Sequence, residues 1–537
     1  MSTLNELVIR YFGPTGYYAQ NTEIEYLIDG KRYLGALDAE IRATVKGDRI
    51  YLVDWFFDPT LDLGGRTLGD ADFLEIGDLL AIKQQDGVDV RVVINGGQFL
   101  GSTNFASYRS NWTALTNLRG RVPPGGTTPP LMTRVLYDWT GADWSGTHHQ
   151  KAALVMRNGV LTAFVAGIDI NPLMLDDRPH NSRQIPPIGT PFVKWGWHDG
   201  GVRLVGSATA DVYQNFAHRW EEAGTLEPAD LWVRAGSGPA KHIRYDPGVT
   251  SGVPALPTQT TATPTAGAAV QVLRSRYDTK LNRPGALKRP WLTAGGGPLR
   301  EVYDTMRKAI GAAESYIYIE DQFLGDHPAL PDAYDELVWR AADRIIDGRT
   351  PRFSLLPFLK AAAKRGVKII FVGSGYADPG DLFTGEKNIT LPRQLKELAA
   401  GNEDRIAVWR LLQQTVHTKL MIVDDEFASI GSANLQARSM IGVDSELHVA
   451  VVSTGTTVRD LRARLWAEHL NVDYDAATDL RPSFDDVTFA LGMWRKIWGN
   501  GVDWFTPDHP LGFTPATLGA GPRTDIVRAY VGPGGSP

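Results

Sequence analysis

The sequence predicts an α/β protein in which one unit, a mixed β-sheet flanked by helices, occurs twice, with the functional site where the two copies meet. Three observations lead to this prediction. The chain has 537 residues, enough for two units of about 250 residues each. A His-x-Lys motif occurs at His149 and again at His417, 268 residues further on. Finally, the predicted strands and helices follow one another in the same order around both motifs.

The elements of each half can be justified in order. A β-branched and aromatic strand comes first, followed by a helix that ends at Gly before a second strand. The His motif then begins a third strand, a fourth strand runs into a Gly-containing turn, and a helix closes the unit. In the first half these segments are 49–59, 80–96, 147–155, 161–171 and 216–222, and in the second half 315–325, 359–375, 416–424, 426–435 and 461–470. The first strands, His motifs and Gly motifs are offset by 266, 268 and 265 residues, which indicates a duplication.

The composition changes near the middle of the chain. Residues 245–269 are rich in Pro, Thr, Ala and Gly and carry almost no charge, which is typical of a linker or a long surface loop. The sequence therefore predicts a first repeat over 1–244, this linker over 245–269, and a second repeat over 270–537 that includes a Trp-rich C-terminal tail.

The two His-x-Lys motifs are the sharpest chemical signal. Side chains at positions i and i+2 share one face of a strand, so His149 lies beside Lys151, and His417 beside Lys419. An ammonium group can neutralise phosphoryl oxygens, and an imidazole can act as nucleophile, acid or base. One such motif would also fit a solvated surface strand. Two motifs at equivalent positions of a repeat favour a shared site around one phosphorus atom.

Small polar side chains follow each motif. Ser432 and Asn434 come after a short strand in the second half, and Asp169 and Asn171 stand at the matching place in the first. Hydroxyl and amide donors suit phosphate oxygens, and the neighbouring Gly allows close approach of the backbone. Either segment alone would fit a common turn. Next to the His-x-Lys motifs we expect these four residues to bind phosphate.

A reactive histidine works better when a carboxylate holds its other ring nitrogen. Asp176 and Asp177 follow the first Gly motif, while Asp444 and Glu446 follow the second. A solvated loop acid is the alternative for each of them. We predict that Asp176 and Glu446 are the partners of the two histidines.

Three further positions complete the candidate set. Asp424 lies seven residues after His417, an odd separation that turns it away from the catalytic face, so we expect a structural role. The first half has Met156 at this position. We expect His198 to orient a neighbouring side chain or simply to be satisfied by local hydrogen bonds. Gln322 ends an apolar strand and is expected to point into the same cleft.

Composition excludes several classes of protein. The absence of cysteine removes disulfides, thiolate nucleophiles and Cys-type metal sites. No metal-binding or P-loop motif occurs, so we expect metal-independent chemistry without a cofactor. The net charge of -6 argues against a general nucleic-acid binder. The start of the chain does not resemble a signal peptide and no apolar run is long enough to span a membrane, which predicts a cytoplasmic protein by default, with non-classical secretion as the alternative.

The chain contains 15 Trp residues, and three of them, Trp494, Trp498 and Trp504, lie in the C-terminal tail. Contact with a lipid interface and a roof over the pocket are two interpretations of this tail. Packing of a C-terminal helix against the core is the third.

These motifs resemble the phospholipase D superfamily, in which paired His-x-Lys signatures are each followed by a Gly-x-Asn or Gly-x-Asp element. Residues 417–446 resemble the second signature nearly throughout, and 317–323 resemble the strand that precedes it in the eukaryotic-type enzymes. Residues 163–170 and 197–220 resemble other segments of the same enzymes. The resemblance covers most of 20–470 and implies two pseudo-symmetric domains with the active site at their interface.

The resemblance implies a double displacement through a covalent phosphohistidine. His149 would be the nucleophile and His417 the acid and base, while Lys151 and Lys419 would hold the phosphoryl oxygens together with Ser432, Asn434 and Asp169 or Asn171. Met156 departs from the family pattern, because the first signature ends there in Asp. Since this position faces away from the catalytic side, we expect activity to survive.

The leading functional prediction is a phosphodiesterase or transphosphatidylase that acts on glycerophospholipids, with peripheral membrane contact and a monomeric state. A nuclease or another phosphodiester transferase of the same superfamily is the first alternative, because one site of this kind serves many diesters. A catalytically weakened binding protein, in which Met156 replaces the Asp, is the second.

Overall fold

The computed structural model of the chain describes residues 2–13, 17–96, 106–138, 148–177, 196–224, 229–233, 241–248, 252–256, 263–276, 299–322, 324–325, 354–374, 401, 405–411, 415–436, 439–440, 442, 444–469, 487 and 526–528. The Trp-rich tail, with Trp494, Trp498 and Trp504, lies outside these residues. No helix within the described ranges is both long enough and apolar enough to cross a lipid bilayer.

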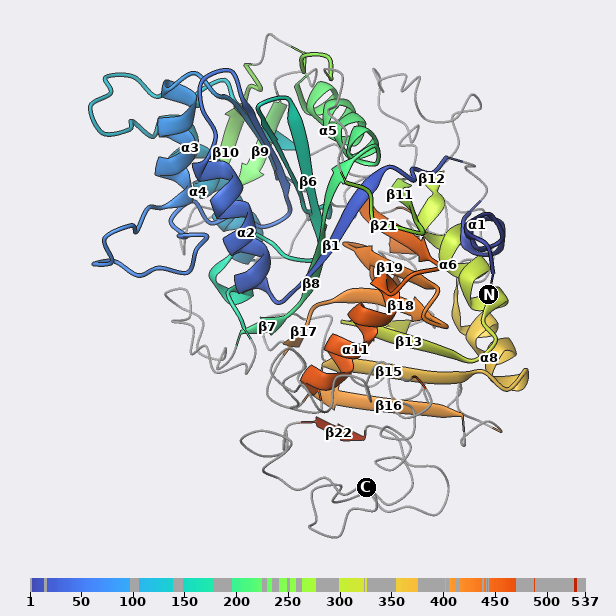
Figure 1. Cartoon of the computed structure of the whole chain (residues 1–537). Helices are drawn as coiled ribbons and strands as arrows, with labels where there is room; N and C mark the ends of the chain where they lie inside the picture. The colour runs from blue at the N-terminus through green and yellow to red at the C-terminus, as the bar shows by residue number, and fades with distance from the viewer. Residues whose placement is uncertain are drawn as a thin grey trace.

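Two large mixed sheets form the framework (Figure 1). The strands of the first sheet, from edge to edge, are β1 (Thr22–Ile28), β8 (Gly200–Gly206), β6 (Val160–Ala166), β5 (Ala152–Arg157), β2 (Arg49–Asp54), β3 (Asp89–Asn95) and β4 (Val135–Asp138). The strands of the second sheet, in the same way, are β12 (Leu299–Arg300), β11 (Ala268–Arg276), β21 (Glu446–Ser453), β19 (Phe427–Gly431), β18 (Lys419–Val423), β13 (Tyr316–Asp321), β15 (Lys368–Ser374), β16 (Ile406–Leu411) and β22 (Ile526–Arg528).

The two sheets repeat one topology. Strands β11 to β16 of the second sheet follow the same order as β1 to β4 of the first, and every corresponding pair has the same parallel or antiparallel sense. In each sheet the His-x-Lys strand, β5 or β18, is central and antiparallel to both neighbours. The predicted fold of two mixed sheets flanked by helices is therefore confirmed.

Helices cover the outer face of each sheet (Figure 1). The helices α2 (Gly30–Arg42), α3 (Ile76–Gln85) and α4 (Ala106–Gly120) pack on the first sheet, where they share one apolar cluster with its strands. The second sheet is covered by α6 (Glu301–Ala312) and α8 (Leu356–Lys364) in the same way.

The inner faces of the two sheets form one continuous core. This core also contains α5 (Thr209–Gly224) and α11 (Thr457–His469), the helices that close the two repeats. Apolar side chains at alternate positions of the strands, such as Leu154 and Ile422, point into it. The two repeats bury their inner faces against each other. Residues at the starts of β5 and β18 are therefore held at fixed positions across the interface.

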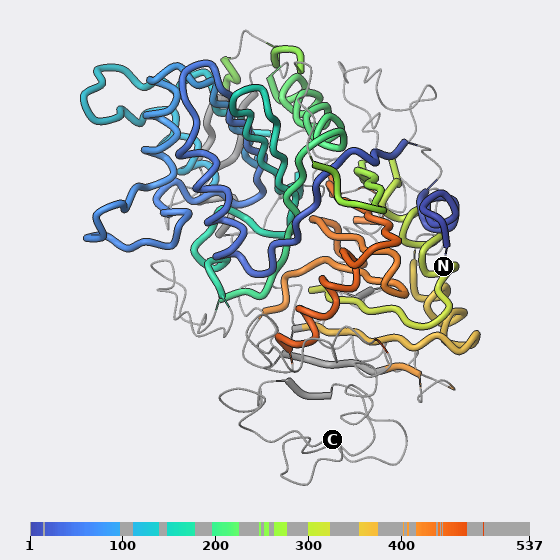
Figure 2. Tube along the Cα trace, in the orientation of Figure 1, coloured from blue at the N-terminus to red at the C-terminus, as the bar shows by residue number. Residues whose placement is uncertain are grey.

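The chain ends of the two repeats are interleaved. The N-terminal helix α1 (Leu4–Tyr11) lies against the second repeat (Figure 2) and packs into its apolar cluster. Tyr11 of this helix stacks on Phe427 with ring centres 5.5 Å apart. Within the expected linker, β10 (Lys241–Tyr245) ends at its first residue and β11 begins at Ala268. Arg91 and Arg119 donate hydrogen bonds to backbone carbonyls between these strands, so the described parts of the segment are tied to the first repeat.

Candidate active site

His149 of the first repeat lies against Glu446 of the second. Its Nδ1 is 3.0 Å from Oε2 of Glu446 and 3.1 Å from the carbonyl oxygen of Ser432. The hydroxyls of Ser432 and Ser439 donate to the two carboxylate oxygens at 2.6 and 2.7 Å. Burial alone would raise the pKa of Glu446, but His149 and these two hydroxyls hold it below its usual value. The carboxylate is thus ionised and fixed against one ring nitrogen, which leaves Nε2 of His149 for chemistry.

His417 of the second repeat lies against Asp199 of the first. The distance from its Nδ1 to Oδ2 of Asp199 is 2.7 Å. Burial raises the pKa of Asp199 to about 6, an effect that Lys419 partly opposes. Burial and the nearby ammonium of Lys419 hold the pKa of His417 well below its usual value. The neutral imidazole therefore donates from Nδ1 to the carboxylate and keeps a lone pair on Nε2.

The backbone makes the same exchange between the repeats. The amide of His149 donates to the carbonyl of Ser445 at 3.0 Å, and the amide of His417 donates to the carbonyl of His198 at 2.8 Å. In each case the residue that offers the carbonyl directly precedes the carboxylate partner. Both histidines are therefore held by the backbone and by the side chain of the opposite repeat, and neither repeat contains a complete site.

The two lysines occupy equivalent positions. Nζ of Lys151 donates to the carbonyl oxygen of His149 at 3.0 Å, and Nζ of Lys419 donates to the carbonyl oxygen of His417. Lys419 also lies 3.5 Å from Oε1 of Gln322. Burial lowers the pKa of Lys419 to about 8. Each ammonium has three donors, so these contacts leave donors for an anion between the repeats.

Two tryptophans, which the sequence analysis did not single out, flank the histidines. The ring of Trp55 contacts His149 edge to face with centres 5.5 Å apart, and it also lies 5.0 Å from Nζ of Lys151. Trp197 lies 4.8 Å from the ring of His417. Part of the Trp content therefore shapes this site. Their positions in the sequence were the available signal. Trp55 directly follows β2, and Trp197 stands two residues before Asp199.

The expected phosphate-binding residues have different surroundings. The hydroxyl of Ser432 is bonded to Glu446, and Oδ1 of Asn171 accepts from the amide of Leu173 and caps a short 3₁₀ turn, Pro172–Met174. Asp169 lies with Oδ1 3.7 Å from Nζ of Lys151. Asn434 is buried, and its Oδ1 has no hydrogen-bond partner among the described residues. The geometry thus leaves Asp169 beside Lys151, while Ser432 and Asn171 support neighbouring groups.

The pairing of Asp176 with a histidine was wrong. Asp176 follows the 3₁₀ turn, where its carbonyl accepts from the amide of Lys31 at the start of α2, and Asp199 takes the place beside His417. The reason is topological. Glu446 opens β21 and Asp199 directly precedes β8, and these are equivalent strands of the two sheets. The expectation placed both acids directly after a Gly motif, whereas in the first repeat the segment before β8 carries the carboxylate.

Asp424 has a structural environment. It adopts a positive φ of 54° in the turn after β18, and its carboxylate accepts from the amides of Glu314, Ser315 and Tyr316 at 2.8 Å each. In the first repeat β5 continues to Arg157, and Met156 points into the core that the two repeats share. The replacement of Asp by Met therefore concerns a hairpin and the core rather than the catalytic face.

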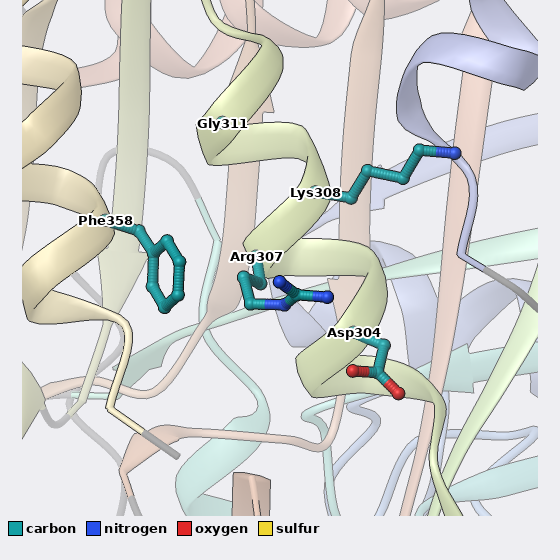
Figure 3. A pocket seen from close by; sticks show the side chains of 5 residues that line it. All are labelled: Asp304, Arg307, Lys308, Gly311 and Phe358. Carbon is teal, nitrogen blue, oxygen red and sulfur yellow. The ribbon is translucent and has the colours of Figure 1, made fainter. Parts of the chain in front are cut away.

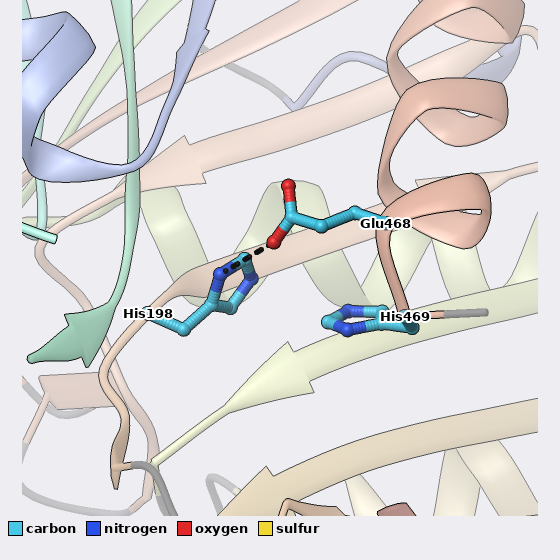
Figure 4. Close-up of side chains that lie close together, drawn as sticks. All are labelled: His198, Glu468 and His469. Atoms are coloured by element: carbon cyan, nitrogen blue, oxygen red, sulfur yellow. Dashed lines mark ion pairs between the residues drawn. The ribbon is translucent and has the colours of Figure 1, made fainter. Parts of the chain in front are cut away.

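His198 belongs to a buried ionic cluster behind the site. Its Nδ1 lies 3.0 Å from Asp29 and 3.1 Å from Glu468, and its Nε2 lies 3.1 Å from Glu320, which also contacts His469 at 2.8 Å. Figure 4 shows His198, Glu468 and His469 of this cluster. Burial opposes the charged form of His198, yet Glu320 and Glu468 raise its pKa well above its usual value. An imidazolium with carboxylates at both nitrogens has no lone pair for a metal ion. The cluster instead anchors the backbone that carries Asp199.

A hollow on the surface of the second repeat is separate from these residues. It has a volume of about 480 Å³ and is lined by Asp304, Arg307, Lys308 and Gly311 of α6 and by Phe358 of α8 (Figure 3). It contains none of the candidate site residues.

The family model and the relatives that match this chain carry the same description. The model of the family described as phospholipase D matches residues 384–486. Phospholipase D alpha 4 of Arabidopsis thaliana is 24% identical over 505 residues, which cover 78% of this chain and 61% of the plant protein. Phospholipase D1 of Saccharomyces cerevisiae is 22% identical over 567 residues, which cover 90% of this chain and 31% of the yeast protein. The chain thus spans about three-fifths or less of the length of these two relatives.

Among solved structures, the phosphatidylserine synthase of Haemophilus influenzae Rd KW20 is similar with a TM-score of 0.49 and 14% identity over 87% of this chain and 88% of that chain.

Proposed function

The chain is a member of the phospholipase D superfamily, and on this premise we propose that it is a phosphodiesterase and transphosphatidylase that acts on glycerophospholipids through a phosphohistidine. The observation that carries the proposal is the pair of reciprocal contacts, His149 with Glu446 and His417 with Asp199, each joining one repeat to the other. The names of the curated relatives supply the phospholipid class.

In the first step Nε2 of His149 attacks phosphorus and the bond from phosphorus to the alcohol oxygen of the headgroup breaks. Glu446 accepts from Nδ1 and stabilises the positive charge that develops on the ring. His417, once protonated beside the bound anion, donates a proton from Nε2 to the leaving alcohol. Asp199 holds its other nitrogen throughout.

In the second step His417 takes a proton from water or from an acceptor alcohol. The oxygen attacks phosphorus, the bond to Nε2 of His149 breaks, and the free histidine returns. Water yields a phosphatidic acid and an alcohol yields a new phosphodiester, because the covalent intermediate is open to either acceptor. The surrounding geometry is nearly equivalent for both histidines, so the choice of His149 as nucleophile follows the resemblance to the family.

Lys151 and Lys419 supply fixed positive charge beside the phosphoryl oxygens. Both are buried, which strengthens their interaction with an anion and removes the cost of reorienting water. Asp169 lies next to Lys151, and Asn434 stands at the equivalent position of the second repeat. The proposal includes contact with a lipid surface, a monomeric protein and catalysis without a metal or a cofactor.

A substrate panel with product identification by mass spectrometry tests this function. The purified chain is incubated with phosphatidylcholine or phosphatidylethanolamine vesicles, or with single- or double-stranded DNA, in the presence of a primary alcohol and a chelator. We expect phosphatidic acid and a phosphatidyl alcohol from the lipids. Cleavage of DNA with intact lipids would assign the chain to the nuclease alternative, and loss of lipid cleavage in chelator would reveal a metal requirement.

A further inference from the structure

Two buried carboxyl groups meet beside the first-repeat lysine. Asp54 ends β2, and Asp169 follows β6. Oδ1 of Asp54 accepts from the amide of Trp55 at 2.9 Å and Oδ2 accepts from the amide of Ile170 at 2.8 Å, while Oδ1 of Asp169 accepts from the amide of Phe56 at 2.9 Å. Both carboxyl groups are therefore fixed by backbone amides and cannot turn away from each other.

The two carboxyl groups lie side by side, because Asp54 accepts from the amide that follows Asp169 and Asp169 accepts from an amide two residues after Asp54. Two ionised carboxylates held this close in a buried site repel each other, which favours a state in which one of the two is protonated. Burial first, and then the charge of Asp169, raise the pKa of Asp54 well above its usual range.

Few charges face this pair. Lys151 lies 3.7 Å from Oδ1 of Asp169, and Tyr33 of α2 faces Asp54. From the second repeat, His417 and Lys419 interact electrostatically with Asp169. Burial holds Tyr33 and His417 in their neutral forms. Lys151 is thus the cation in direct reach, and it can balance one negative charge but not two.

The second repeat offers an internal comparison. Oδ2 of Asp321 accepts from the amide of Leu435 at 2.9 Å, just as Oδ2 of Asp54 accepts from the amide of Ile170. Asn434 directly precedes Leu435, whereas Asp169 directly precedes Ile170. The second repeat therefore has an Asp and an Asn where the first has two Asp residues, and an amide corresponds in shape and charge to a protonated carboxyl.

We propose that Asp54 and Asp169 share one proton, so that each repeat presents the same charge, one carboxylate and one ammonium, to a bound phosphodiester. With both carboxyls ionised, the first repeat would place an extra negative charge beside an anionic substrate. The shared proton removes this repulsion and keeps the geometry of an acid and amide pair. The role of the shared proton toward a phosphodiester rests on the proposed function. The presence of the proton does not, because it is held in the free protein.

Infrared difference spectroscopy of the free protein near pH 7 tests the shared proton. The wild type is compared with Asp169→Asn, which copies the second repeat, and with Asp54→Asn as a second variant. We expect each difference spectrum to lose one carbonyl band of a protonated carboxylic acid. Asp321→Asn is the matched control, because this Asp has an amide neighbour and we expect its removal to cost a carboxylate band only. Asn434→Asp should recreate the pair and gain one carboxylic acid band.

An unchanged acid band in both Asp169→Asn and Asp54→Asn would overturn the proposal, as would the loss of an acid band in Asp321→Asn. The measurement needs no substrate. A chain that fails to cleave phospholipids can therefore still show the shared proton, and an active phospholipase can lack it, so the two proposals fail separately.

Discussion

Glu446 of the second repeat lies 3.0 Å from Nδ1 of His149 in the first repeat, and Asp199 of the first repeat lies 2.7 Å from Nδ1 of His417 in the second. Backbone contacts between the repeats accompany both pairs: residue 148 forms a β-bridge with Ser445, and residues 415–416 pair with residues 197–198. A histidine and its carboxylate thus reach each other only after the repeats have docked.

The first prediction concerns this exchange. Glu446→Gln and Asp199→Asn should each lower kcat by about 100-fold or more, because the amide no longer fixes the tautomer or stabilises the charged ring. Asp176→Asn should change kcat by less than about tenfold, since Asp199 stands beside His417. Steady-state kinetics on phosphatidylcholine measure all three variants. A larger loss in Asp176→Asn than in Asp199→Asn would reverse the assignment.

The second prediction contrasts the ends of the two His-x-Lys strands. Asp424→Ala removes the acceptor of three backbone amides and should cost about 1–3 kcal/mol of unfolding free energy. Met156→Asp, which restores the family residue, should cost about 3 kcal/mol or more, because it buries a charge in the shared core. Denaturant unfolding measures both. A Met156→Asp protein with unchanged stability and higher kcat would show that the site had lost a catalytic group.

The third prediction is a bell-shaped pH profile. Burial raises the pKa of Asp199 to about 6 and lowers that of Lys419 to about 8. Asp199 must be ionised to hold His417, so kcat/KM should rise as pH increases through about 6. Lys419 must be charged to bind the phosphoryl oxygens, so kcat/KM should fall above about 8. Lys419→Arg, which stays charged, should move the alkaline limb upward. An alkaline limb that does not move in this variant would belong to another group.

The same pKa values have opposite consequences for stability. Asp199 holds its proton up to a higher pH when folded than when unfolded, so its contribution falls as pH rises between about 4 and 6. Lys419 loses its proton more readily in the folded state, so between about pH 8 and 10.5 the unfolded chain binds more protons and this contribution rises with pH. The activity profile and the stability profile should therefore differ at both limbs.

The sequence predicted the repeated fold because each half carries the same order of strand patterns, and hydrophobic periodicity is set locally. It also placed His149 beside Lys151 and His417 beside Lys419, because residues two apart share one face of an extended segment, and it selected Glu446 as a carboxylate partner. In the structure the two motifs lie at the starts of β5 and β18. Asp199 was missed, because spacing along the chain describes neighbours within a repeat and not contacts made by docking. The position of Asp199 before β8, equivalent to that of Glu446 at β21, was the available signal.

The pair of Asp54 and Asp169 was hidden for a related reason. Asp54 ends β2, and Asp169 lies 115 residues further along the chain. Their proximity therefore depends on the register of β2, β5 and β6. The positions of Trp55 and Trp197 beside the histidines were not predicted either. A high Trp content does not reveal which of the rings flank a site.

The most direct test of the account is the identity of the residue that becomes covalently modified. The chain is mixed with phosphatidylcholine, quenched in denaturant at alkaline pH, where a phosphorus–nitrogen bond is stable, digested and examined by peptide mass spectrometry. We expect a phosphatidyl adduct on His149, and no adduct in His149→Ala or in a protein without substrate. An adduct on His417 alone, or steady turnover by His149→Ala, would contradict it.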